Sequence, residues 1–209
     1  INMKTLTKEM QNAITPSFAL DLLKDGNKRF VSNLKINRNL LQQANETSDG
    51  QHPFAVILSC IDSRTSAELI FDQGLGDVFS VRIAGNIVNE DILGSMEFGC
   101  KVAGAKIIVV LGHTKCGAVK GACDNVALGN LTGLIAKIKP AVEQEAVTAE
   151  NRNSSNGVFV ENVAELNVSL SVKNILLKSP IIADMVKNGD IGIVGGIHDI
   201  TTGEVKFFE

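Results

Sequence analysis

The sequence predicts an α/β fold in which a mainly parallel β-sheet is flanked by helices and carries one antiparallel edge strand. Two observations predict this fold. Short apolar runs of strand length alternate along the chain with longer stretches whose apolar residues recur at helical spacing, which is typical of parallel sheets joined by helices. The last two expected strands are separated only by a tight turn at Thr202-Gly203, and such a turn joins antiparallel strands.

Five segments are predicted as strands: residues 54–59, 78–82, 106–111, 191–197 and 204–208. Segment 54–59 is a continuous apolar run, typical of a strand that is buried on both faces. Segment 106–111 is rich in β-branched residues and ends at Gly112, which strengthens the prediction of a strand. In parallel sheets functional residues collect beyond the carboxyl ends of the strands, so the residues that follow these segments are the candidates for chemistry.

Seven segments are predicted as helices: residues 16–34, 66–71, 91–103, 116–124, 131–147, 158–177 and 180–188. The first begins at Thr15-Pro16, with proline at the first helical position where its missing N–H costs nothing. The polar segments 37–51 and 150–157 are predicted as loops. At about 150 residues per domain, we expect one domain over residues 1–209, with residues 16–34 as an N-terminal helical extension.

Composition excludes several classes of protein. The chain has 20 basic and 23 acidic residues, so it lacks the positive excess that nucleic-acid binding requires. No apolar stretch approaches the roughly 20 residues that cross a bilayer, and no signal peptide is visible, so we expect no membrane partner and a cytoplasmic location, or a periplasmic one if a signal has been removed. Four cysteines are too few for a disulfide scaffold. Cys100 and Cys123 lack partners at ligand spacing and are predicted to pack as small apolar groups.

Metal-ligand residues follow two of the predicted strands. Cys60 and Asp62 come after segment 54–59, and His113 and Cys116 come after segment 106–111. Taken alone, each pair is more often a packed cysteine or a helix cap with a surface ion pair. Together, at one edge of one sheet, two thiolates, an imidazole and a carboxylate would complete a tetrahedral zinc site. The sequence therefore favours a metal centre.

The motifs Cys60-x-Asp62-Ser63-Arg64 and His113-x-x-Cys116-Gly117 resemble the signature of the β-class carbonic anhydrases, specifically the plant-like subtype that bicarbonate does not inhibit. Residues 81–86, 94–97 and 109–113 support the resemblance. It extends over about residues 16–208 and is densest between residues 54 and 121. The motif set is highly specific for this family.

The resemblance implies a carbonate dehydratase that reversibly hydrates carbon dioxide to bicarbonate and a proton by means of hydroxide bound to Zn²⁺. Cys60, His113 and Cys116 would be the permanent zinc ligands. Asp62 would either bind zinc and block the site or pair with Arg64 and leave the fourth position to water. An arginine is always protonated and its fork matches a carboxylate, so Arg64 would compete with the metal for Asp62. Asp62 and Arg64 are thus the expected catalytic dyad.

The family's substrate pocket is expected to include Gln51, Phe79, Phe98 and Gly117. Gln51 lies nine residues before Cys60, where the plant-like members carry a glutamine. Phe98 stands where a tyrosine is common, so one hydroxyl is missing while the apolar wall is kept. Ordinary core packing would also explain both phenylalanines. Gly117 would offer a backbone N–H or allow a close approach.

One departure from the family concerns regulation. The bicarbonate-inhibited subtype has a tryptophan three residues before its first zinc cysteine, where this chain has Ile57, and it also uses a tyrosine. The chain contains no tryptophan or tyrosine. Although Arg82 is present, we expect no inhibitory bicarbonate site, and an enzyme that is open and active at neutral pH without a steep cooperative pH switch.

Three alternatives remain at the level of sequence. Hydrolysis of carbonyl sulfide or carbon disulfide would use the same zinc ligands. A catalytically silent zinc scaffold would keep Asp62 as a permanent fourth ligand, since structural zinc sites are closed. A redox protein is disfavoured because no Cys-x-x-Cys pair is present.

The resemblance also implies a homodimer or homotetramer. In this family the N-terminal helix serves dimerisation by embracing the partner, and the walls of the pocket are shared across the interface. Segment 16–34 is amphipathic and suits that role. Its apolar face could instead pack on the chain's own sheet.

Overall fold

A computed structural model describes residues 5–208, so residues 1–4 and 209 of the predicted domain lie outside the described part of the chain. Five strands form one sheet in the order β2-β1-β3-β4-β5. They are β1 (Ala55–Ser59), β2 (Val78–Arg82), β3 (Ile107–His113), β4 (Gly192–His198) and β5 (Val205–Phe207). The first four are parallel and β5 runs antiparallel to β4 at the edge. The mainly parallel sheet with an antiparallel edge is therefore confirmed.

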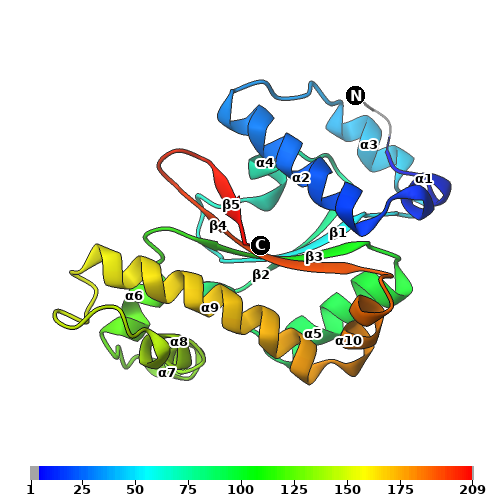
Figure 1. Cartoon of the computed structure of the whole chain (residues 1–209). Helices are drawn as coiled ribbons and strands as arrows, with labels where there is room; N and C mark the ends of the chain where they lie inside the picture. Colours follow the sequence, from blue (N-terminus) through cyan, green and yellow to red (C-terminus); the bar gives the residue numbers. More distant parts are fainter. Residues whose placement is uncertain (1–4, 209) are drawn as a thin grey trace.

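Helices cover the sheet on both sides (Figure 1). One side carries α1 (Lys8–Ala13), α2 (Pro16–Val31), α3 (Leu40–Glu46) and α4 (Ala67–Ile70). The other side carries α5 (Glu90–Glu97), α6 (Gly117–Cys123), α7 (Gly129–Ile135), α8 (Lys139–Gln144), α9 (Gly157–Lys178) and α10 (Pro180–Lys187). None of the helices in residues 5–208 has the length and apolar character that crossing a bilayer demands.

The core consists of two apolar clusters, one on each face of the sheet. Successive residues of β1 alternate between them: Val56 and Leu58 belong to the cluster under α9, whereas Ala55 and Ile57 belong to the cluster under α2. Every residue of β1 and β3 is buried. The unbroken apolar runs of the sequence thus reflect strands covered on both faces.

The N-terminal helix α2 packs on its own sheet. Thr15 caps it by accepting a hydrogen bond at Oγ1 from the Phe18 N–H, and Ala19 and Leu23 are fully buried in the same cluster as Ile57. The apolar face of segment 16–34 packs on the chain's own sheet, and the role of this helix in dimerisation stays a prediction. Phe18 is 52% exposed, so part of the helix stays free to meet a partner.

Two short helices depart from the prediction. The expected loop over residues 37–51 contains α3, so that prediction was wrong there, and α1 was not predicted at all. Neither helix carries a long apolar stripe. Each is fixed by one buried glutamine: Gln11 donates to the carbonyls of Pro53 and Ala103, and the Gln43 side chain accepts from the Leu75 N–H. Such contacts join distant parts of the chain and leave no local pattern.

Two predicted helices also differ in form. The helix expected over residues 131–147 is divided into α7 and α8, because Pro140 lacks the N–H that would continue α7. The helix expected over residues 91–103 begins as α5 and ends in a π-turn, Phe98–Val102. A Cβ on Gly99 within that turn would lie 2.6 Å from Val56 Cγ2. The turn therefore brings the backbone at Gly99 directly onto β1.

Candidate metal centre

Cys60, His113 and Cys116 converge at the carboxyl ends of two neighbouring strands. Cys60 directly follows β1, His113 ends β3, and Cys116 precedes α6. Their ligand atoms all lie within 4.8 Å of one another, and all three residues are buried. From β1 the chain continues to β2 on one side of the sheet, whereas β3 lies on the other. The cluster thus occupies the point where the strand order reverses, which is where sheets of this kind bind ligands.

Backbone N–H groups surround the two sulfur atoms. The Gly85 N–H donates to Cys60 Sγ over 3.3 Å, and the N–H groups of Val119 and Ala118 at the start of α6 favour the thiolate of Cys116. The hydrogen bond between the two thiols lowers the pKa of Cys60 and raises the pKa of Cys116. The pair is therefore arranged to hold negative charge, which a divalent cation would neutralise.

The two nitrogens of the His113 ring differ in their hydrogen bonding. Its Nδ1 lies 2.9 Å from the carbonyl oxygen of Thr114, so Nδ1 carries the proton and Nε2 keeps its lone pair. Nε2 is buried and has no hydrogen-bond partner among residues 5–208. An orphaned buried nitrogen beside two thiols fits a metal ligand whose tautomer is fixed from the other side of the ring.

Asp62 and Arg64 form the expected pair. Arg64 donates from Nε to Asp62 Oδ1 at 3.0 Å and from Nη2 to Oδ2 at 2.8 Å, and its backbone N–H also reaches Oδ1. These bonds hold the pKa of Asp62 well below its usual range. Asp62 Oδ2 lies 3.9 Å from His113 Nε2. The carboxylate is therefore held at the edge of the cluster, facing the arginine.

Two residues hold the ligand loops in place, a role that the sequence analysis predicted for neither of them. Arg82 donates from Nε to the Cys60 carbonyl at 3.0 Å and from Nη2 to the Asp62 carbonyl at 2.6 Å. Glu161 on α9 accepts the backbone N–H of Lys115, whose φ of 57° is left-handed. Arg82 could have been found as a charged residue at a strand end. Glu161 lies 46 residues beyond Lys115, and no sequence signal marks it.

Three of the four expected substrate residues, Gln51, Phe79 and Phe98, lie away from the cluster within one chain. Gln51 is exposed and precedes β1, whereas Cys60 follows it, and five strand residues span roughly 16 Å. Phe79 stands beside Val56 near the start of β1 and makes an edge-to-face contact with Phe98, with ring centroids 6.1 Å apart. They line a groove of about 790 Å³ with Arg82. One chain by itself does not bring these side chains to the cluster.

Gly117 is the first residue of α6. A Cβ there would meet nothing within 4 Å. The close approach that was one of its expected roles is therefore not required by any contact among residues 5–208.

The remaining cysteines and histidines lie outside the cluster. Cys100 and Cys123 are buried members of the core under α9, as predicted, and burial raises the pKa of Cys100 to about 12. His198 stands beside His113 in the strand register and is buried. Burial, helped by the neighbouring His113, lowers the pKa of His198 to about 4. His52 is half-buried and precedes β1.

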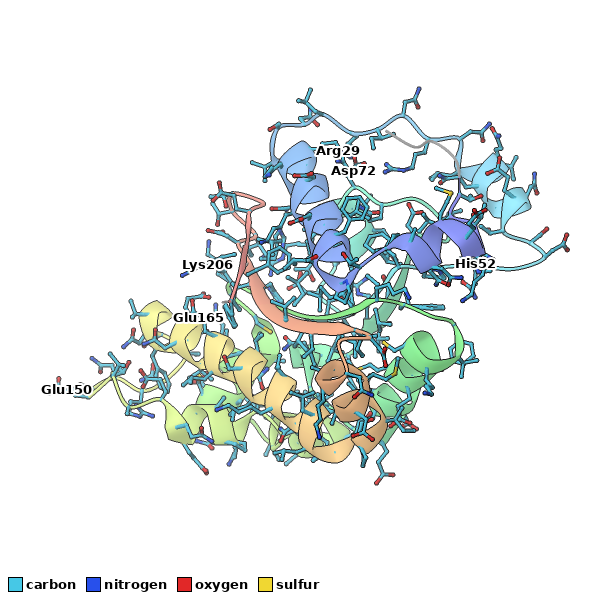
Figure 2. The ribbon with its side chains drawn as sticks, turned by 45° about the vertical axis from the view of Figure 1, so that its right-hand side comes forward. Arg29, His52, Asp72, Glu150, Glu165 and Lys206 are labelled. Carbon is cyan, nitrogen blue, oxygen red and sulfur yellow. The ribbon has the colours of Figure 1, made fainter. Side chains whose placement is uncertain are left out.

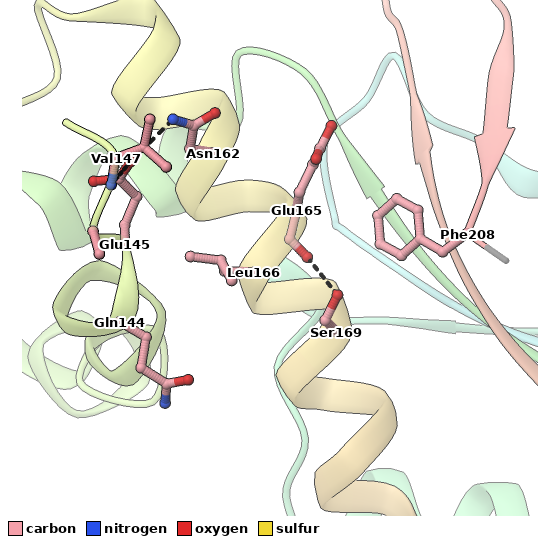
Figure 3. Close-up of a pocket in the computed structure, with 9 residues that line it drawn as sticks. Gln144, Glu145, Val147, Asn162, Glu165, Leu166, Ser169 and Phe208 are labelled. Carbon is pink, nitrogen blue, oxygen red and sulfur yellow. Dashed lines mark hydrogen bonds between the residues drawn. The ribbon is translucent and has the colours of Figure 1, made fainter.

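A separate pocket of about 450 Å³ lies between α9, the segment after α8 and Phe208 (Figure 3). Its most buried acid, Glu145, accepts hydrogen bonds from Arg152, Thr148 and Asn162. That carboxylate ties the segment after α8 to α9 and is already satisfied. The pocket contains no cysteine or histidine, so its lining differs in kind from the metal-ligand cluster.

Comparison with known proteins places this arrangement in a family. A family model described as carbonic anhydrase matches residues 55–205. Carbonic anhydrase 2 of Mycobacterium tuberculosis is 35% identical over 195 residues, which cover 90% of each chain. The carbonic anhydrase of Mycolicibacterium smegmatis is 34% identical over 193 residues, 91% of this chain and 92% of that one.

Solved structures agree. The β-carbonic anhydrase CafA of Aspergillus fumigatus superposes with a TM-score of 0.71 at 28% identity, covering 92% of this chain and 90% of that chain. A tetrameric β-carbonic anhydrase of Sordaria macrospora gives 0.70 at 26% identity, covering 78% and 84%. The chain therefore belongs to the β class of the carbonic anhydrase family.

Proposed function

We propose that this chain catalyses the zinc-dependent, reversible hydration of carbon dioxide to bicarbonate and a proton. One observation carries the proposal: Cys60, His113 and Cys116 bring three buried ligand atoms within 4.8 Å of one another, beside a carboxylate that Arg64 holds aside. Two thiolates and one imidazole form a donor set typical of tetrahedral zinc, and three protein ligands leave the fourth position open for chemistry.

The residues of this site have separate roles in the proposed reaction. Zinc bound by the three ligands would act as a Lewis acid that brings the pKa of a water molecule toward neutrality. Asp62, with both oxygens facing Arg64 and one of them 3.9 Å from His113 Nε2, is placed to accept a hydrogen bond from that water and so to orient it. Arg64 keeps Asp62 charged and keeps it from becoming a fourth ligand. Arg82 holds the loop that carries Asp62.

We propose that a second copy of the chain completes the substrate pocket. Support comes from the position of Gln51, Phe79 and Phe98, which are away from the cluster in their own chain. Phe98 is 52% exposed beside the edge strand β2, and a structural relative is described as tetrameric. In this proposal the apolar wall that faces carbon dioxide comes from the partner, and Gly117 lies at the mouth of the pocket.

We also propose the subtype that bicarbonate does not inhibit. Ile57 is fully buried in the cluster under α2, so its side chain offers nothing to an anion. The Nε and Nη2 groups of Arg82 already donate hydrogen bonds to the carbonyls of Cys60 and Asp62.

The four free cysteines support a location in a reducing compartment such as the cytoplasm.

Stopped-flow hydration of carbon dioxide tests the proposal, on protein of measured zinc content and beside Asp62→Asn. We expect one zinc per chain, fast hydration, and a sharp fall in the variant with its zinc retained. Zinc at one per chain without hydration would refute the proposed substrate, and carbonyl sulfide and carbon disulfide would be assayed next. Freshly reduced protein that binds no zinc would refute the ligand assignment.

A further inference from the structure

A tight turn beyond β2, Ala84–Asn86, lies directly against the metal-ligand cluster. Gly85 has φ of 67° and ψ of 19°, a left-handed conformation that glycine adopts without strain. Its N–H donates to Cys60 Sγ over 3.3 Å. A Cβ on Gly85 would lie 2.6 Å from Ile138 Cδ1 and 3.2 Å from Ala118 Cβ. The turn is therefore packed closely between neighbouring elements, with its N–H aimed at the sulfur.

A side chain from α9 holds the other half of this turn. Asn167 is 4% exposed, and its Nδ2 donates to the carbonyl oxygen of Gly85 over 2.9 Å. One turn further along α9, Ser171 Oγ reaches the carbonyl of Asn86 at 3.4 Å. Two buried donors on one face of α9 thus hold successive carbonyls of the turn. With its carbonyl fixed, Gly85 cannot rotate its backbone without losing the bond to Asn167.

The choice of asparagine at position 167 needs an explanation. Asparagine is a poor helix former, and burying its amide is costly unless the amide is hydrogen-bonded. The side chain lies in a 22-residue helix whose other buried residues are mostly apolar. A leucine at this position would favour helix formation and would pack in the apolar core without burying a polar group. What asparagine adds at this place is the donor to Gly85.

We propose that Asn167 is a positioning residue of the metal centre, acting through Gly85 on the sulfur of Cys60. The inference rests on the proposed role of Cys60 as a metal ligand. An N–H bond to a ligating thiolate withdraws electron density from sulfur, so it lowers the charge that the thiolate donates to the metal. Partners of this kind orient ligands and tune the metal. Without the Asn167 donor, the Gly85 N–H turns from Cys60 and the thiolate becomes a stronger donor.

The test uses the full chain loaded with cobalt(II) or zinc, and compares wild type with Asn167→Leu. Leucine keeps the approximate volume of the side chain and removes the donor. Ile175→Val is the matched control, because Ile175 is fully buried on the same helix eight residues further on. Two quantities are measured: the wavelength of the thiolate-to-cobalt charge-transfer band, and the zinc dissociation constant by competition with a chromophoric chelator.

We expect the band of Asn167→Leu to move to longer wavelength, because a more electron-rich sulfur gives up its electron more easily. We expect its zinc dissociation constant to rise about tenfold, the lower end for outer partners of metal ligands, because the loss of a fixed orientation of Cys60 outweighs the gain from a more electron-rich sulfur. The control should keep both wild-type values. If Asn167→Leu does not fold, Asn167→Ser, which retains a shorter donor, should show a smaller shift in the same direction.

Wild-type values for both quantities in the Asn167 variant, or an equal change in the control, would overturn the positioning role and leave the metal centre intact. Wild-type protein that binds neither ion would overturn the metal centre, and this inference with it. The two failures are therefore distinguishable.

Discussion

Arg64 holds both carboxylate oxygens of Asp62, at 3.0 Å from Nε and 2.8 Å from Nη2, while one of those oxygens stays 3.9 Å from the ring nitrogen of His113. The carboxylate thus lies between Arg64 and His113, which is a proposed metal ligand. In the proposed function, Asp62 paired with Arg64 leaves the fourth metal position open and Asp62 bound to the metal closes it, so the geometry of this pair would control access to the site.

Replacing Arg64 should therefore close the site. In Arg64→Ala nothing competes with the metal for Asp62, and we expect carbon dioxide hydration at neutral pH to fall by about 10- to 100-fold. Arg64→Lys keeps the charge but not the fork, and we expect an intermediate loss. Stopped-flow rates and zinc content are measured together. Full activity in Arg64→Ala with zinc in place would contradict the control of access by the pair.

The pH profile of hydration should rise through and above neutrality in a single step. Two thiolates donate more negative charge to zinc than three histidines, which bring the pKa of a zinc-bound water to about 7, so the water should be less acidic here. In the proposed subtype, Ile57 is buried and Arg82 is engaged with the Cys60 carbonyl, so we expect no cooperative inhibition by bicarbonate. Stopped-flow rates from pH 6 to 9 check this, and a flat profile or a steep cooperative one would refute it.

A buried ion-pair cluster lies beside α2, on the side of the sheet that α2 covers. It should make a large contribution to the free energy of unfolding. Asp72 is 5% exposed and accepts from Arg29 Nε at 2.6 Å and from Arg38 Nη1 at 2.7 Å. Figure 2 labels Arg29 and Asp72, which lie next to each other. Asp72→Asn leaves two arginines without their carboxylate, and we expect a loss of about 3–5 kcal/mol in the free energy of unfolding, measured by urea denaturation at pH 7.

In acid, the difference in the free energy of unfolding between wild type and Asp72→Asn should become smaller. Burial alone would raise the pKa of Asp72, but the hydrogen bonds from Arg29 and Arg38 outweigh it, so the pKa lies below its ordinary value. A lowered folded-state pKa contributes stability above the unfolded value of about 3.9 and loses it as the pH falls. The gap between wild type and Asp72→Asn should therefore be constant above about pH 5 and narrow below pH 4. A gap that persists in acid would mean that the charge of Asp72 is not its source.

At Gly26 the helix α2 lies close against the backbone of Phe71. A Cβ there would lie 1.8 Å from the carbonyl oxygen of Phe71, which is backbone and cannot move aside cheaply. We expect Gly26→Ala to destabilise the protein by about 3 kcal/mol. Gly94→Ala in α5 is the control, because a Cβ there meets nothing within 4 Å, and it should instead gain about 0.5–1 kcal/mol. Equal effects in urea denaturation would refute the close packing at Gly26.

The sequence alone was enough to predict the parallel sheet and the convergence of its ligands. Residues 55–58 in β1 and 107–111 in β3 are continuous apolar runs, which are typical of strands covered on both faces. Residues that follow such strands meet at one edge of the sheet. The sequence therefore predicts that Cys60, His113 and Cys116 belong to one site. These three ligands lie within two short motifs, so a local stretch of sequence is enough to identify them.

Tertiary structure alone decided which groups surround the ligands and where the substrate residues lie. The donor from Gly85 to Cys60 spans 25 residues and the bond from Asn167 to Gly85 spans 82, and contacts between such distant positions leave no periodic trace. The short helices α1 and α3 depend on single buried glutamines for the same reason. Gln51 is near Cys60 in sequence yet at the opposite end of β1 in space, because an extended strand carries its two ends apart.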